Sequence, residues 1–231
     1  MTKFKETIVL LLSLVFIFAM LTYTFQEKAI FWYLYAFTLL VGIAIALVFG
    51  KFEDQLPTWK YLIYGTGYGT ITYGLVKLGY IILPSIDASV PKDVSKFLST
   101  YGLVKLGFII LPYIDSSVTK EVSKFLSTYG PTNIWHYLML IFIVVVGEEI
   151  FWRGYVQQQL KRFTSPIYAV FVTAILFSLS LAISGFMPGA LAAIVAGLLW
   201  GALYEWKKSL PLVIVAHLVF VLLLFLILPI M

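Results

Sequence analysis

The chain has 231 residues, of which 61% are hydrophobic and 12% are charged, and its net charge is +5. Several apolar runs reach the roughly 20 residues that a helix needs to cross a hydrocarbon core, which excludes a soluble domain and predicts an all-α, polytopic transmembrane helix bundle. The absence of cysteine excludes disulfides, thiolate metal sites and a cysteine nucleophile. We expect no nucleic-acid partner, and we assign the positive charge to loop lysines that orient the helices and touch anionic lipid head groups.

The N-terminal segment raises the question of a signal peptide, because Lys3 and Lys5 precede an apolar run over residues 8–24. This run is longer than the usual core of a signal peptide, and it ends without a small-residue cleavage site. We therefore predict a retained first helix.

About seven to eight membrane spans are predicted along the chain. Seven of them cover residues 8–25, 29–49, 61–83, 134–153, 166–183, 190–204 and 210–228. One side of the membrane receives eight loop cations, and the positive-inside rule makes it cytoplasmic: Lys3, Lys5, Lys51, Lys60, Lys161, Arg162, Lys207 and Lys208. We divide the chain into N-terminal helices (1–60), a third span with a duplicated unit (61–132) and a C-terminal helical core (133–231), and we expect a multi-pass protein of the cell membrane.

Residues 73–100 are followed at once by a near copy, 101–128, which indicates a tandem duplication of a helix and an amphipathic loop. The apolar part of the second copy, 97–111, is short and contains Lys105, so re-entrant, interfacial and short tilted paths all stay open. A full crossing would turn the later cytoplasmic cations outward, so we expect no net crossing. The mixed-charge linkers predict amphipathic segments on the outer leaflet.

Two carboxylates and a guanidinium lie at the end of the fourth predicted span, in the run Gly-Glu-Glu-Ile-Phe-Trp-Arg-Gly over residues 147–154. Ionisable groups are costly in a bilayer, so three together predict a functional site. On one helix Glu149 and Arg153 are four residues apart and can pair, whereas Glu148 is turned about 100° away. One carboxylate is then neutralised, and Glu148 is left available for chemistry.

The two histidines of the chain lie in different settings. His136 stands between aromatic residues at the outer start of the fourth span, where we predict an interfacial anchor. His217 lies inside the apolar run 213–228, where it could simply form a hydrogen bond to a neighbouring helix. With Glu148 in the same bundle, however, an imidazole and a carboxylate can share the general-base and oxyanion-stabilising roles of hydrolysis.

Glycine spacing predicts close helix packing at two places. Gly197 and Gly201 form a GxxxG face on the sixth span, which we expect to approach the fourth or the seventh span. The glycines within residues 65–69 are likewise assigned to helix packing. Glu205, at the cytoplasmic end of the sixth span, is predicted to be a solvated end residue.

Metal and serine chemistry find little support in the sequence. Catalytic zinc usually takes three protein ligands, and the chain has no HExxH motif. Glu148, Glu149 and His217 could form a poor ligand set, but Glu149 is better explained by Arg153. No Gly-x-Ser-x-Gly motif is present, and no Ser-His-Asp set is suggested. We therefore expect no cofactor and no metal.

The motif EExxxR at a helix end, the stretch Gly-Leu-Leu-Trp-Gly-Ala-Leu-Tyr-Glu at 197–205 and the helix of His217 together resemble the CPBP family. These proteins are also called Abi, or CAAX protease and bacteriocin-processing proteins. The resemblance covers residues 135–221 and implies a multi-span intramembrane glutamate protease, related to the type II CAAX prenyl endopeptidases. It also implies roles for individual residues.

By this resemblance, Glu148 activates the attacking water, Glu149 and Arg153 organise the site, and His217 helps to hold the water or the oxyanion. All four are therefore candidate catalytic residues.

Two positions depart from the family's pattern. Leu181 stands where the family's second motif, FxxxH, has histidine, and Val221 stands where its third motif, HxxxN, has asparagine. Neither side chain is a base or a hydrogen-bond donor, and the loss of one oxyanion donor can lower the rate about 10²- to 10³-fold. A hydroxyl of Ser178, Ser180 or Ser184 could take over.

Two functions stay open from the sequence. The first is an intramembrane endopeptidase that hydrolyses a peptide bond of a membrane-associated peptide or small protein, such as a bacteriocin-like or signalling peptide. The second is a catalytically impaired relative that binds a membrane partner or acts as a bacteriocin-immunity protein. A proton-coupled transporter has less support, because no clear inverted repeat with broken helices is present. The expected partners are membrane lipid and a membrane-associated peptide or protein.

Overall fold

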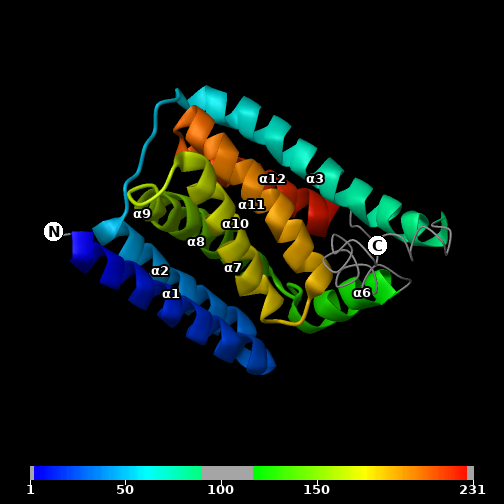
Figure 1. The fold of residues 1–231 in the computed structure, drawn as a ribbon. Helices are drawn as coiled ribbons and strands as arrows, with labels where there is room; N and C mark the ends of the chain where they lie inside the picture. The colour runs from blue at the N-terminus through cyan, green and yellow to red at the C-terminus, as the bar shows by residue number, and fades with distance from the viewer. Residues whose placement is uncertain (1–2, 90–116, 228–231) are drawn as a thin grey trace, which may run out of the picture.

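The computed structural model describes residues 3–89 and 117–227 of the chain. Within these residues the secondary structure is helical, and the only pairing of strand type is an isolated antiparallel bridge between Asp54 and Ser209. The predicted all-α bundle is confirmed (Figure 1).

The helices follow one another with short connections on both sides of the segment 90–116. The N-terminal part contains α1 (Lys3–Gln26), the 3-10 turn η1 (Lys28–Ile30), α2 (Phe31–Phe49) and α3 (Thr58–Ser89). The next elements are α6 (Ser117–Tyr129), α7 (Ile134–Met139), the π-helical η3 (Leu140–Val144), α8 (Val145–Glu149), the π-helical η4 (Ile150–Gln157) and α9 (Gln158–Leu160). The last elements are α10 (Pro166–Ala182), α11 (Met187–Lys207), α12 (Leu210–Leu222) and the π-helical η5 (Leu223–Ile227).

Local sequence explains several helix ends. A proline occupies the first turn of α10, α11 and α12, where its missing N–H costs no helical hydrogen bond. The side chain of Asn133 caps α7 by accepting a hydrogen bond from the backbone N–H of His136 at 3.1 Å. α11 stops at Lys208, which adopts a left-handed conformation with φ of 49°.

Four helices of the described residues are long and apolar enough to cross a membrane: Phe4–Gln26, Lys28–Phe49, Ile134–Leu160 and Met187–Lys207. They correspond to the first, second, fourth and sixth predicted spans. The fifth and seventh predicted spans are also apolar helices, Pro166–Ala182 and Leu210–Phe225, but they are shorter. The third predicted span lies within α3, which continues past it to Ser89.

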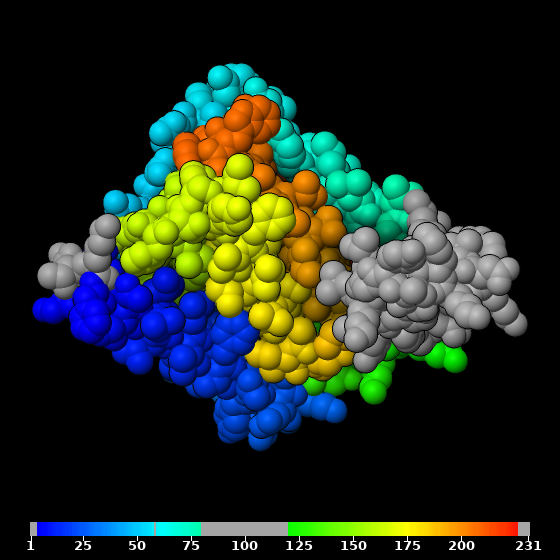
Figure 2. Space-filling model, viewed as in Figure 1, coloured from blue at the N-terminus to red at the C-terminus, as the bar shows by residue number. Residues whose placement is uncertain are grey.

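The fourth span holds the centre of the bundle. α8 and η4 contact α2 on one side and α12 on the other, while α10 packs along α11 and α3 packs along α12. In Figure 1 the α1–α2 pair and the α3–α12 pair lie on opposite sides of this central helix. Figure 2 shows one face of the same bundle, filled without a break from α2 to α10 and α11.

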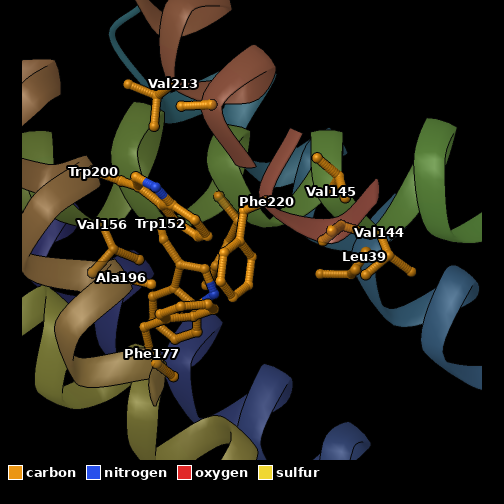
Figure 3. Close-up of a cluster of buried hydrophobic side chains, with 14 of the residues drawn as sticks. Leu39, Val144, Val145, Trp152, Val156, Phe177, Ala196, Trp200, Val213 and Phe220 are labelled. Carbon is orange, nitrogen blue, oxygen red and sulfur yellow. The ribbon is translucent and has the colours of Figure 1, made fainter. Parts of the chain in front are cut away.

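Large aromatic residues fill the core beside the fourth span. Trp152, Phe177, Trp200 and Phe220 are all less than a tenth exposed, and they come from four different elements (Figure 3). Burial of such rings supplies much of the packing energy that fixes the positions of helices η4, α10, α11 and α12.

Two glycine faces set the helix contacts, and one of them also meets a partner that was not predicted. A Cβ atom at Gly69 would lie 2.4 Å from the Ala216 carbonyl oxygen, so α3 packs on α12 through this face. A Cβ at Gly197 or Gly201 would lie 3.0 Å from Ala174 or Val170, both on α10. Gly201 also meets the fourth-span helix, because a Cβ there would lie 3.0 Å from Gln157 Oε1 and its carbonyl accepts a hydrogen bond from Gln157 Nε2 at 3.1 Å. The predicted approach to the fourth span is therefore confirmed for Gly201, whereas the contact of both glycines with α10 was not predicted. The short 183–186 connection makes α10 and α11 neighbours.

Most of the second repeat copy falls in residues 90–116, outside the described residues, so its path across the membrane stays a prediction. Its charged linker is α6. The helix is amphipathic as predicted: Val122 is buried, Phe125 is half-buried against the bundle, and Lys120 and Lys124 are exposed. Its place on the outer leaflet stays a prediction.

Candidate active site

The structure brings the four predicted site residues together from three elements. Glu148 and Glu149 come from α8, Arg153 from η4 and His217 from α12. Glu149 Oε1 accepts a hydrogen bond from Arg153 Nη1 at 3.0 Å and one from His217 Nδ1 at 2.8 Å. The predicted i, i+4 pair is confirmed, and both of its side chains are fully buried. We call these three residues and Glu148 the α8 cluster.

The contact with Glu149 fixes the imidazole of His217. A carboxylate can only accept hydrogen bonds, so Nδ1 carries the proton of this bond. In the neutral ring Nε2 then has the lone pair, and it lies 3.8 Å from Glu148 Oε2. The ring also stacks on Trp200, with centroids 4.1 Å apart. His217 therefore presents one defined nitrogen to Glu148.

Glu148 is held by a residue that the sequence analysis missed. The phenol of Tyr35, on α2, donates a hydrogen bond to Glu148 Oε1. Tyr35 lies in an apolar span that contains other aromatic residues, so no spacing or motif distinguishes it. Its role becomes visible only where α2 packs against the fourth span.

Arg153 is held by one carboxylate and two aromatic faces. Its guanidinium carbon lies 4.8 Å from the centre of the Phe177 ring and 5.4 Å from the centre of the Trp200 ring. Its Nε and Nη2 atoms are buried without a hydrogen-bond partner. A cation in this setting depends on Glu149 and on the ring quadrupoles for its stability.

Glu148 and His217 face a largely apolar cavity of about 200 Å³. We call it the chamber. Side chains of α2, α6, α10, α11 and α12 contribute to its wall, with Phe125 and Leu126 of α6 on one side. Leu181 and Val221, the two departures from the family motifs, also line it. Hydrocarbon thus occupies the two places where the family pattern has polar side chains.

Three serines were considered as replacements for the missing hydrogen-bond donors, and each donates a hydrogen bond to a backbone carbonyl instead. Ser178 donates to Ala190 O at 2.7 Å, Ser180 to Phe177 O at 2.6 Å and Ser184 to Leu181 O at 2.6 Å. Only Ser180 lines the chamber. The suggestion that a serine replaces the missing donor is therefore not supported.

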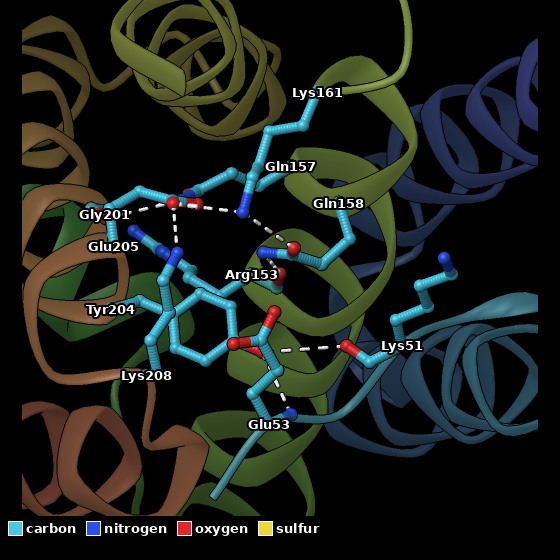
Figure 4. A network of polar contacts seen from close by, with 10 residues as sticks. All are labelled: Lys51, Glu53, Arg153, Gln157, Gln158, Lys161, Gly201, Tyr204, Glu205 and Lys208. Atoms are coloured by element: carbon cyan, nitrogen blue, oxygen red, sulfur yellow. Dashed lines mark hydrogen bonds and ion pairs between the residues drawn. The ribbon is translucent and has the colours of Figure 1, made fainter. Parts of the chain in front are cut away.

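A second polar cluster surrounds Glu205 at the end of α11 (Figure 4). Glu205 Oε2 pairs with Lys161 at 2.9 Å and with Lys208, while Oε1 accepts a hydrogen bond from Gln157 at 2.9 Å. The prediction of a solvated end residue is wrong, because α9 and the α11–α12 turn converge on this carboxylate. We call this group the Glu205 cluster, and it lies outside the chamber lining.

Among the described residues, no group of three histidine, aspartate or glutamate side chains could hold a metal ion. His136 stacks on Trp32, with centroids 5.3 Å apart, and lies outside the chamber lining. His217 is therefore the one histidine that the structure places beside the carboxylates.

Comparison with protein families matches residues 130–223 to the family described as type II CAAX prenyl endopeptidase, Rce1-like. Over these residues the chain is similar to that family. The match spans α7 to α12 and contains the whole α8 cluster, together with Leu181 and Val221. No curated protein and no solved structure matches the chain. The resemblance inferred from the motifs is confirmed, and the Rce1-like core is a membrane protein.

Proposed function

We propose that this Rce1-like protein is an intramembrane endopeptidase in which Glu148 is the general base. The observation that carries the proposal is the pairing of Glu149, and not Glu148, with Arg153. Glu148 is thereby a carboxylate without an arginine partner, beside His217 and on the wall of an apolar chamber. Such a site suits the activation of water for attack on an amide.

In the proposed reaction Glu148 acts first as a base and then as an acid. Glu148 takes a proton from water, and the hydroxide forms a bond to the carbonyl carbon of the substrate. The oxyanion that forms requires stabilisation by a hydrogen-bond donor close to Glu148. Glu148 then gives its proton to the amide nitrogen as the carbon–nitrogen bond breaks, which leaves a carboxylic acid and an amine.

Glu149 and Arg153 are assigned to positioning. Glu149 holds the Nδ1–H of His217, and this leaves Nε2 directed toward Glu148, where it can hold the attacking water. Arg153 neutralises Glu149, so the cluster carries less uncompensated charge inside the membrane.

The apolar chamber suggests the class of substrate. Its wall is built mostly from aliphatic and aromatic side chains, which would accept hydrophobic groups next to the cleaved bond. We propose a membrane-associated peptide or small protein as the substrate, lipid as a further partner and the cell membrane as the location.

The proposal is tested by comparing membrane-peptide profiles, using mass spectrometry, from cells with the wild type, Glu148→Gln, Glu205→Gln or no copy. Glu148→Gln keeps the size of the side chain and removes the base, so its products should be absent. Glu205→Gln makes the same chemical change outside the chamber and should retain them. Equal profiles for the wild type and Glu148→Gln would overturn the proposal.

A second function has one observation in its favour. Leu181 and Val221 replace polar motif residues and line the chamber with hydrocarbon. This supports a non-catalytic relative that binds a membrane peptide or protects against a bacteriocin. Equal peptide profiles, together with retained binding of a membrane peptide, are the expected result for that function.

A further inference from the structure

Tyr35 stands apart from the family match, because it lies on α2 and the match covers residues 130–223. It nevertheless lines the chamber, and its phenol donates a hydrogen bond to Glu148 Oε1. A hydroxyl group that contacts the general base also lies close to the water and carbonyl on which that base acts. The described geometry thus adds a fifth polar residue to the four that the motifs predict.

The other hydroxyls of the chamber wall are directed elsewhere. Ser180 donates to the Phe177 carbonyl at 2.6 Å, and Tyr129 donates to the Phe25 carbonyl at 2.9 Å. Leu181 and Val221 have no donor at all. Among the described lining residues with a hydroxyl, Tyr35 alone directs it to a group of the α8 cluster.

Aromatic packing holds the Tyr35 ring. Its centroid lies 5.4 Å from that of Phe31 and 6.4 Å from that of Phe25. A donor that is already fixed in place stabilises a developing charge without the cost of reorganisation at the moment of reaction.

We propose that Tyr35 is a catalytic residue that donates a hydrogen bond to the substrate oxyanion, an inference that rests on the proposed endopeptidase function. In the resting site the phenol donates to the Glu148 carboxylate. When Glu148 has taken the proton of water it is a weaker acceptor, and the new oxyanion is a stronger one, so the same O–H turns to the oxyanion. No bond to Tyr35 forms or breaks, and its proton stays on the phenol.

The test compares Tyr35→Phe with Tyr155→Phe, a matched loss of one buried phenol outside the chamber lining. Tyr155 is fully buried, and its hydroxyl lies 3.3 Å from Ser13 Oγ. Each protein is purified into lipid nanodiscs and assayed on a synthetic peptide that spans a bond whose cleavage in cells requires Glu148. We expect kcat to fall about 10²-fold for Tyr35→Phe with KM changed less than about twofold, and Tyr155→Phe to match the wild type.

The possible outcomes separate this inference from the function on which it rests. An unchanged kcat for Tyr35→Phe, or a rise in KM alone, overturns the role of Tyr35 while an inactive Glu148→Gln leaves the endopeptidase intact. Cellular peptide profiles that are equal for the wild type and Glu148→Gln overturn both. The two phenylalanine variants should unfold at the same temperature. A lower unfolding temperature for Tyr35→Phe alone would show that the phenol stabilises the fold and would overturn its catalytic role.

Discussion

The α8 cluster and the Glu205 cluster use the same chemical groups in opposite ways. In both, a glutamate pairs with a cation: Glu149 with Arg153 of η4, and Glu205 with Lys161, which directly follows α9. The first pair is fully buried, whereas the side chains of the second are 14% and 20% exposed. The first pair also contacts His217, which lines the chamber, while the second ties the end of α9 to the end of α11.

The difference shows that an ion pair in this bundle is not by itself a sign of chemistry. Partly exposed pairs lose little when they are broken, because water replaces the missing partner. A fully buried pair leaves an uncompensated charge when one partner is removed. The neighbours of each pair distinguish a reactive site from a structural ion pair, and above all Glu148, which has no arginine partner.

The largest effect is expected from removal of the buried cation. Arg153→Ala strands Glu149 and should lower the free energy of unfolding by about 3–5 kcal/mol. Lys161→Ala, the corresponding change in the Glu205 cluster, should lower it by about 1 kcal/mol or less. Thermal unfolding in detergent measures both, and an equal loss for the two variants would contradict the comparison.

A further change should sharpen the chemistry of the chamber. Leu181→His, which adds a hydrogen-bond donor to the wall, should raise kcat by about tenfold or more on a peptide that the wild type cleaves. Leu179→His is the control, because this residue lies on the same helix but is 49% exposed on the surface of the bundle. A rise for Leu179→His, or no rise for Leu181→His, would show that the chamber wall does not limit the rate.

The packing of α3 against α12, the helix that carries His217, can be tested by substitution of a glycine in α3. Gly69→Ala would place a Cβ against the Ala216 carbonyl and should displace α12, lowering stability by about 1–3 kcal/mol and weakening cleavage. Gly67→Ala, with nothing within 4 Å, should be neutral within about 1 kcal/mol. Unfolding and cleavage assays on both variants provide the check, and similar behaviour of the two would refute this support of α12.

The smallest effect is expected in the Glu205 cluster. Glu205→Gln removes two partly exposed ion pairs but retains an acceptor for Gln157, so stability should fall by about 1 kcal/mol or less. The difference from the wild type should shrink at high salt, because added ions screen exposed pairs. Thermal unfolding at low and high salt measures this difference. A loss of stability that does not depend on salt would contradict the partial exposure of these ion pairs.

Much of the site could be predicted because its first elements are local. Glu149 and Arg153 lie one helical turn apart, so helix geometry alone pairs them and leaves Glu148 free. The glycine spacing also identified true packing faces. It could not identify α10 as a partner helix, because a GxxxG face fits any close neighbour and the chain connection decides which one is present.

The sequence by itself determined the class of protein, because apolar runs of membrane length are typical of spanning helices and a charged motif within them is typical of a functional site. It also identified the four motif residues of the α8 cluster. Only the tertiary structure decided that Tyr35 donates to Glu148, that the three serines donate to the backbone, and that Glu205 forms structural ion pairs. Hydrogen bonds between side chains far apart in the chain depend on how the helices pack, and the sequence of a single span does not show which helices pack against it.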